Sequence, residues 1–291
     1  MTPSLPDSWI ARSLAAASLL FLSFAGQCQE SEPQTVHWAY ASFFGTGWYT
    51  IADQRSSFIL NIAPRKTIGE AGFDEHGQRT IAWTLRLPMS IGVNRFDVED
   101  IPGLVDFDNF AAASVGFAAD ADIPLNRRFS IRPGAELGYG RVLGERNSAW
   151  TYRAEVKSRY TFGAGVTEAA LLGGAGVVGY EPNTGRRDSF TFLTMAAEFE
   201  RPVDWLGGDD QTVLYWHLAY TEFLDEVEYE VTRDSVDTVT NYWQIGAAIG
   251  KRDRPLQFGI LRFDRLGLAY DISPSGDFRG VKLVFRSWYD R

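Results

Sequence analysis

The sequence predicts an all-β fold, a closed antiparallel transmembrane β-barrel of about twelve strands, and an even number is usual for single-chain membrane barrels. Three observations carry this prediction. Segment 150–162 alternates between apolar and charged residues. Similar alternation returns along much of the 291-residue chain. Beyond the N-terminal region, no apolar run reaches the 18 or so residues that a membrane-spanning helix needs.

Segment 150–162 has the clearest alternation. Successive side chains of a strand leave opposite faces, so the face opposite Val156 carries four charged residues, Arg153, Glu155, Lys157 and Arg159. Soluble strands average about 5–6 residues, whereas a tilted membrane strand needs about 9–11. The aromatic residues at both ends fit the girdles at the two membrane interfaces. Because a soluble sandwich strand also alternates, the prediction depends on how often the pattern recurs.

The composition limits the possible partners and cofactors. A net charge of −9 disfavours nucleic acid as a partner. The chain has 1 Cys, which excludes an intrachain disulfide and a Cys-based zinc site. Its 3 His are widely separated. We therefore expect no metal and no cofactor.

The N-terminal residues predict export. Arg12 precedes an apolar run over 14–24, and Ser23 and Ala25 are small residues at the −3 and −1 positions of a cleavage site. The expected parts are a signal peptide (1–25), a short polar lead (26–35) and a barrel (36–291). A short membrane anchor is an alternative, as is a lipoprotein attached through Cys28, although the preceding residue is not small.

The first half of the barrel contains five predicted strands, at 36–51, 57–63, 80–93, 110–123 and 129–139. Segments 67–78 and 97–108 are expected loops, the second of them acidic, and 125–128 is a tight turn. Three residues of these strands belong to the predicted lipid-facing set, Trp83, Leu85 and Leu137. If both chain ends lie on one side of the membrane, short and long connections should alternate, and loop 67–78 breaks that rule.

The second half contains seven predicted strands, at 150–162, 168–180, 189–199, 213–222, 242–250, 258–272 and 281–289. Short turns are expected at 163–165 and 253–255, and a long acidic loop at 225–239. A change of phase near Arg265 indicates a bulge. The remaining lipid-facing predictions are Val156, Trp216, Leu218 and Ile245.

The charged residues of two consecutive strands should face the lumen together. The predicted lumen-lining set is Arg132, Glu136, Arg153, Glu155, Lys157, Arg159 and His217. These charges fit a selectivity lining, or a ladder of cross-strand ion pairs that fills the lumen. A catalytic His217 would need a nucleophile within hydrogen-bond reach, and run 215–219 contains no Ser. We therefore assign no catalytic residue.

The acidic loops 97–108 and 225–239 could bind Ca²⁺ or bridge lipopolysaccharide phosphates through divalent ions. Their spacing matches no calcium-binding loop, so we interpret them as solvated. Segment 173–176 is glycine-rich, but it lacks the Lys-Ser/Thr that follows in a phosphate-binding loop.

The end of the chain carries a resemblance. Gly280, Leu283 and Phe285 have the spacing of the C-terminal signal read by the outer-membrane assembly machinery, although Phe278 replaces a polar residue and Asp290-Arg291 replaces a terminal aromatic. With the signal peptide and the alternating strands, the chain resembles a bacterial outer-membrane β-barrel. Its length and strand number are similar to those of a solitary autotransporter-type translocator barrel without a passenger.

The resemblance implies the outer membrane as location and three partners, its lipid, lipopolysaccharide and the assembly machinery. Autotransporters carry a passenger and a helix inside the lumen. A lumen-spanning helix needs roughly 20 residues, and only about ten precede the first predicted strand, so we expect neither plug nor passenger.

The function predicted from the sequence is a structural, pore or transport role, with a narrow lumen lined by paired charges and no enzyme activity. The transported solute stays open. One alternative is an outer-membrane lipid hydrolase of similar barrel size. A second alternative is a secreted soluble β-sandwich, which would pack its apolar faces on each other.

Overall fold

The computed structural model describes residues 41–51, 55–96, 110–143, 146–163, 167–183, 187–203, 212–232, 235–251, 256–258 and 261–290. The predicted signal peptide (1–25), polar lead (26–35), acidic loop 97–108 and turn 253–255 lie outside these residues. Within the described part of the chain, no helix is long and apolar enough to cross a membrane.

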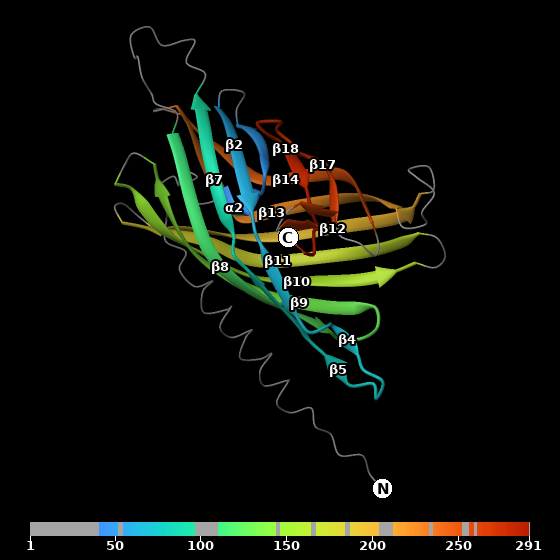
Figure 1. The fold of residues 1–291 in the computed structure, drawn as a ribbon. Helices are drawn as coiled ribbons and strands as arrows, with labels where there is room; N and C mark the ends of the chain where they lie inside the picture. The colour runs from blue at the N-terminus through green and yellow to red at the C-terminus, as the bar shows by residue number, and fades with distance from the viewer. Residues whose placement is uncertain are drawn as a thin grey trace. The chain divides into compact units, whose positions relative to one another are not determined.

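A closed antiparallel β-barrel dominates the described residues (Figure 1). Each strand pairs with its neighbours along the chain, and the first and last close the ring through the pair Gly47↔Lys282. The twelve ring positions among the described residues are β1 (Gly47–Ile51), β2 (Arg55–Ile62), β7 (Met89–Phe96), β8 (Phe110–Pro124), β9 (Phe129–Val142), β10 (Ser148–Phe162), β11 (Glu168–Pro182), β12 (Asp188–Pro202), β13 (Thr212–Thr232), β14 (Ser235–Lys251), β17 (Arg265–Ile272) and β18 (Phe278–Val284). The predicted fold class is confirmed.

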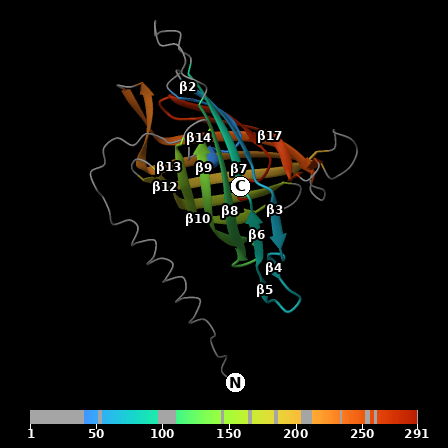
Figure 2. The ribbon, with the colours of Figure 1, turned by 60° about the vertical axis from the view of Figure 1, so that its left-hand side comes forward.

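Two prolines interrupt strands on one side of the ring. The strand β2 continues as β3 (Arg65–Ile68) beyond Pro64, and β6 (Ala82–Arg86) continues as β7 beyond Pro88. Proline has no N–H to donate to a sheet. Each proline therefore interrupts the backbone hydrogen bonds of its strand, and the chain continues along the barrel wall beyond it. The expected loop 67–78 starts within β3 and contains β4 (Gly72–Phe73), which pairs with β5 (Arg79–Thr80) just after the loop. This small hairpin lies at the end where β3 and β6 project (Figure 2).

The prediction of a first strand at 36–51 is wrong for residues 41–46, the first part of its described length. Residues Ala41–Phe44 form a one-turn helix, α2, and the barrel begins only at Gly47. Gly45 ends the turn with a φ of 86°, the left-handed region that glycine adopts at no steric cost. The aromatic residues that suggested a strand are placed in part on this turn.

Two further segments differ from the prediction. Within the expected acidic loop 225–239, residues 225–232 belong to β13 and residues 235–239 to β14. Their pairing has register shifts between Glu222 and Val227 and between Glu230 and Thr232. The change of phase near Arg265 marks a new strand, because a small hairpin of β15 (Leu256–Phe258) and β16 (Leu261–Phe263) ends just before it. The regular pairing of β17 with β14 starts at Arg265 itself.

The two faces of the barrel have opposite character. Large apolar side chains are exposed on the outer face, whereas buried charged and polar residues point inward. This distribution comes from one sheet closed on itself, not from two sheets packed face to face, so the β-sandwich alternative is wrong.

Candidate functional site in the barrel interior

All seven predicted lumen residues lie on the inner face. Arg132 and Glu136 are on β9, and the four charged residues of β10 lie beside them. In the register, Arg153 is opposite Glu136, and Lys157 is opposite Arg132. His217 is on β13 and only 4% exposed. These residues therefore share the inner face of β9, β10 and β13, and their role as a pore lining stays a prediction.

The ion pairs of β10 form along the strand. Glu155 lies 2.6 Å from an Arg153 Nη atom and 3.2 Å from Lys157 Nζ. A cross-strand pair accompanies them, because Arg153 on β10 is opposite Glu136 on β9 and their charges attract. Residues two apart on one strand share a face, and the long basic side chains reach the carboxylate between them.

Arg132 also pairs outside the predicted set. Its guanidinium lies 2.8 Å from Asp122 and 3.6 Å from Asp120, both on β8, and 2.5 Å from Asp290. Its register partner Lys157 has the same sign, so the compensating carboxylates come from the other neighbouring strand and from beyond β18. Partner choice depends on the three-dimensional register, which alternation alone does not contain.

The segment Phe285–Asp290, here called the tail segment, leaves the sheet and enters the barrel. The prediction that the last strand extends to residue 289 is wrong, because β18 ends at Val284. The tail contacts strands on the far side of the ring. Ser287 Oγ donates to Glu198 on β12 at 2.7 Å, and the backbone N–H of Trp288 donates to the same carboxylate at 2.7 Å. These contacts bring the tail between opposite walls (Figure 1).

Tyr289 anchors the tail segment. Its side chain is 1% exposed and packs with a cluster from β11, β12 and β13 that includes Leu172 and Ala219. The hydroxyl donates to Asp122 at 3.1 Å and lies 3.0 Å from Ser130 Oγ. Arg132 covers the ring at 4.2 Å from its centroid. Burial raises the pKa of Tyr289 above its ordinary value, so the phenol remains a neutral donor.

Two other tail residues fit the barrel wall. Burial opposes the charge of Asp290, but the nearby positive charge of Arg132 outweighs it and lowers the pKa of that carboxyl. A Cβ on Gly174 would lie 2.7 Å from the Trp288 ring, so the absence of a side chain there makes room for the indole. The glycine-rich segment 173–176 therefore accommodates the tail, at least at this position.

An aromatic cluster fills another part of the interior. Phe43 of α2 makes edge-to-face contacts with Phe190 and Phe192 of β12, with ring centroids 5.2 and 5.1 Å apart. Phe44 packs against Tyr49 and Phe278. Both α2 and the tail segment occupy the interior, which the sequence reasoning did not predict. Neither forms the long central helix considered from the sequence.

His217 belongs to a buried polar chain across four neighbouring strands. Its Nε2 lies 3.0 Å from Gln244 Oε1 on β14, and the Gln244 amide donates to Asp271 on β17 at 2.6 Å. Asp271, which is fully buried, lies 2.6 Å from Lys282 Nζ on β18. A chain of paired polar groups satisfies buried charges that would be costly alone. Sequence alternation placed His217 inside but could not supply its partners.

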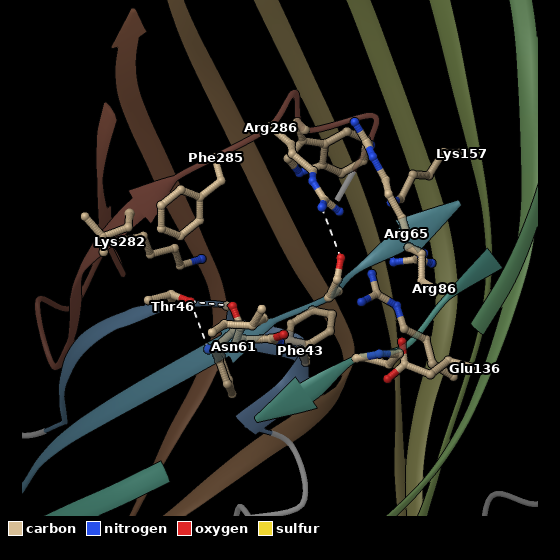
Figure 3. A pocket seen from close by; sticks show the side chains of 18 of the residues that line it. Phe43, Thr46, Asn61, Arg65, Arg86, Glu136, Lys157, Lys282, Phe285 and Arg286 are labelled. Carbon is tan, nitrogen blue, oxygen red and sulfur yellow. Dashed lines mark hydrogen bonds between the residues drawn. The ribbon is translucent and has the colours of Figure 1, made fainter. Parts of the chain in front are cut away.

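A cavity of about 670 Å³ remains between α2, the β2–β3 and β6–β7 breaks, the tail segment and the opposite wall (Figure 3). Among the described residues that line it, seven are Lys or Arg and two are Asp or Glu. Lys66 and Thr67 are exposed at its rim, so the cavity reaches solvent at that end. Arg65, Arg86 and Arg286 are lining residues that the sequence reasoning did not single out.

The predicted lipid-facing residues lie on the outer face. Trp83, Leu137 and Ile245 are exposed over about half of their surface or more, at 53%, 56% and 62%. Leu218 is also exposed, and Leu85, Val156 and Trp216 are intermediate. Contact with lipid stays a prediction.

The predicted assembly signal spans the end of the sheet. Gly280 lies on β18, where a Cβ would be 2.8 Å from the Tyr49 ring. Leu283 donates its N–H to the Thr46 carbonyl at 2.9 Å. Phe285 lies just beyond the strand, with its ring centroid 4.8 Å from that of Phe263. In the described part of the chain, no three His, Cys, Asp or Glu side chains are grouped to hold a metal ion.

No protein-family model matches the sequence, and no curated protein matches it. Solved structures do resemble it. The translocator domain of autotransporter NalP from Neisseria meningitidis is 12% identical with a TM-score of 0.53, over 94% of this chain and 94% of that chain. The β domain of the Bordetella autotransporter BrkA is 12% identical with a TM-score of 0.52, over 81% of this chain and 92% of that chain.

This chain has the fold of an autotransporter translocator barrel. The resemblance stated from the sequence is confirmed at the level of the fold. At such low identity the likeness extends to the fold alone, so the function has to be argued from this chain's own interior.

Proposed function

We propose that this protein is an outer-membrane β-barrel with a pore or transport role, and that its tail segment and paired charges keep the lumen narrow at rest. One observation carries the proposal: the tail segment is held by hydrogen bonds inside a ring whose outer face is apolar. Outer-membrane lipid and lipopolysaccharide would surround the barrel, and the outer-membrane assembly machinery would insert it.

The outer apolar surface supports a membrane location. Exposed apolar residues recur around the ring, for example Phe117, Leu171 and Leu268 at 56%, 53% and 57%. A soluble monomer rarely exposes a continuous apolar patch larger than a few hundred Å². Lipid would satisfy this surface, and the pairing of β1 with β18 closes the edges that an open sheet would leave unpaired in the hydrocarbon.

The spacing of the outer aromatic residues fits the thickness of a bilayer. Trp150 is exposed and makes an edge-to-face contact with Tyr139 near one end of β10. Tyr160 is exposed near the other end of the same strand. The ten residue steps between Trp150 and Tyr160 cover about 33 Å along the strand at about 3.3 Å each. A strand tilt of about 40° reduces this to about 25 Å, the height of the apolar band in outer-membrane barrels.

The interior supports a narrow rather than an open pore. Twelve strands give a ring wider than the eight-stranded barrels that side chains just fill and narrower than the 16–18-stranded porins. The filling therefore decides conductance. Here the tail segment, the aromatic cluster around Phe43 and the Arg153–Glu155–Lys157 group occupy the space.

The direct test ends the chain after Phe285 and compares its single-channel conductance with that of the full chain in planar bilayers. The full chain should conduct weakly, and the shortened chain should show larger and longer openings. Heat-modifiable migration on gels would verify that both barrels are closed and folded. A large, steady conductance of the full chain, unchanged by the truncation, would contradict the proposal.

A further inference from the structure

We propose that the cavity beside the tail segment binds a soluble phosphate monoester, with the phosphate held by Arg65, Arg86 and Arg286. The inference rests on the proposed pore function, because it names the class of solute that enters the lumen. The binding site itself is argued from the positions of its residues.

Two of the three arginines are placed directly opposite each other. Arg65 opens β3 and Arg86 ends β6, and the two residues are register partners in the antiparallel pair. Like charges at such positions destabilise a sheet. An anion between the two guanidinium groups would relieve that repulsion, which gives a physical reason for binding at this place.

The available carboxylates compensate this group only in part. Arg65 lies 2.6 Å from Asp264, and Arg86 lies 3.1 Å from Asp120. Asp120 is shared, because Arg132 also lies 3.6 Å from it. Glu136 and Glu155 also lie near Arg86, and both lie near Arg153 as well. Each carboxylate around Arg86 is therefore shared with another cation.

Arg286 adds a third guanidinium from the tail segment. Its Nη2 donates to the Ala63 carbonyl at 3.0 Å, a neutral acceptor. Burial, followed by the nearby charge of Arg65, lowers the pKa of Arg286 to about 10. The nearby carboxylates of Asp264 and Asp290 act in the opposite direction. The guanidinium is therefore cationic at neutral pH, and a phosphate nearby would stabilise its charge further. In Figure 3, Arg65, Arg86 and Arg286 gather on the side of the cavity away from Lys282.

The chemistry of the cavity matches a phosphate with a small organic group. Planar guanidinium forks bind phosphate oxygens through pairs of charge-assisted hydrogen bonds. The volume of about 670 Å³ lies within the range of small-molecule sites, about 300–1,000 Å³. Phe43, Phe285 and Trp288 also line the cavity and offer apolar surfaces to the organic part.

The test is calorimetric binding to the full chain in detergent, with inorganic phosphate, glucose 6-phosphate and glucose as probes. Glucose 6-phosphate should bind more tightly than inorganic phosphate, and glucose should not bind. The variants Arg286→Gln and Arg65→Gln should each weaken phosphate binding about tenfold, which corresponds to about 1.4 kcal/mol. Arg286→Lys should lose less, because it keeps the charge but not the fork.

Arg79→Gln is the matched control, since Arg79 is an exposed arginine on the β5 hairpin outside the cavity. Arg65 lies on the barrel wall, so a loss in Arg65→Gln cannot come from removing a tail side chain. The proposal is overturned if neither phosphate binds, or if both cavity variants bind like Arg79→Gln. Binding of a short-chain phosphatidic acid without glucose 6-phosphate would also overturn it, because the site would then serve a lipid headgroup.

Binding and conduction separate the two proposals. Calorimetry requires no ion flow, whereas the truncation experiment is recorded in potassium chloride without phosphate. A barrel that binds phosphate but never conducts would refute the pore role and leave the binding site in place. A barrel that opens on truncation but binds no phosphate would refute the binding site and leave the pore role in place.

Discussion

The contact between Glu198 and the tail segment yields the sharpest prediction. Glu198→Gln keeps the size of the side chain but removes its charge. The native carboxylate accepts two hydrogen bonds of 2.7 Å, from Ser287 Oγ and from the Trp288 N–H. The glutamine amide has only one oxygen to accept with, and its NH₂ group faces a donor instead.

The expected effect follows from these two bonds. Hydrogen bonds to charged groups contribute about 1.5–3 kcal/mol and neutral ones about 0.5–1.5 kcal/mol, so each weakened bond loses about 1 kcal/mol. Two bonds give about 2 kcal/mol, or about a 30-fold change in the equilibrium between docked and released tail. Arg265, 3.5 Å from the native carboxylate, also loses a charged neighbour, which adds to the destabilisation of the docked state.

The assay is the fraction of time that a single barrel spends open in a planar bilayer. Glu198→Gln should raise this fraction by about 30-fold if tail release opens the lumen. Glu200→Gln is the control, because Glu200 lies two residues further on the same face of β12. If the two variants differ from the wild type by the same small factor, the Glu198 contacts do not hold the lumen closed and the reasoning is refuted.

Three further predictions concern the lining, the outer face and His217. Replacing both Glu136 and Glu155 with Ala should raise conductance and shift selectivity toward anions, because the basic residues of β10 remain; unchanged reversal potentials in a salt gradient would count against a role for these charges. Val156→Arg should destabilise the folded barrel by roughly 2–4 kcal/mol if the site lies near the bilayer midplane, measured by reversible unfolding in lipid, and no loss would mean that Val156 does not face the hydrocarbon. His217→Ala should leave phospholipid hydrolysis at background in a detergent assay, and wild-type hydrolysis that the substitution abolishes would support the lipid hydrolase alternative instead.

The alternation of β10 shows how far the sequence could go. A strand has a period of two, so Glu155 and Lys157 had to share one face and Val156 the other, whatever the neighbouring strands were. Burial in the structure follows that rule, with Glu155 and Lys157 only 6% and 4% exposed. The alternation of buried and exposed faces is therefore a local property of a barrel strand, and it can be read from the residues of that strand alone.

Long-range contacts escaped the same reasoning. Nothing near Arg132 in the sequence identifies Asp290 as its partner, because the two meet only after the tail segment folds back into the ring. The strand break at Pro88 escaped for a different reason. Alternation continues across this proline, so the pattern hid an interruption that the missing backbone N–H imposes. At Pro64 the predicted strand ended at residue 63, and the continuation of the wall as β3 was missed.

The end of β18 did carry a usable signal. Asp290 and Arg291 depart from the terminal aromatic residue expected of an assembly signal, and Asp290 pairs with Arg132 and does not lie in the sheet. A charged side chain such as Asp290 would be costly on the lipid face of a strand. Once the last strand stops at Val284, the interior is the place within reach where Arg132 can pair with it.

Charge totals conceal the arrangement that matters most for a lumen. The chain has a net charge of −9, which by itself suggests that anions are repelled. Yet the described residues that line the cavity include seven cations and two carboxylates. A sum over the sequence mixes outward loops with inward walls, whereas a solute inside the barrel meets only the wall. Under the proposed pore role, we therefore expect the local excess of basic residues, and not the net charge of the chain, to set the ion preference of the interior.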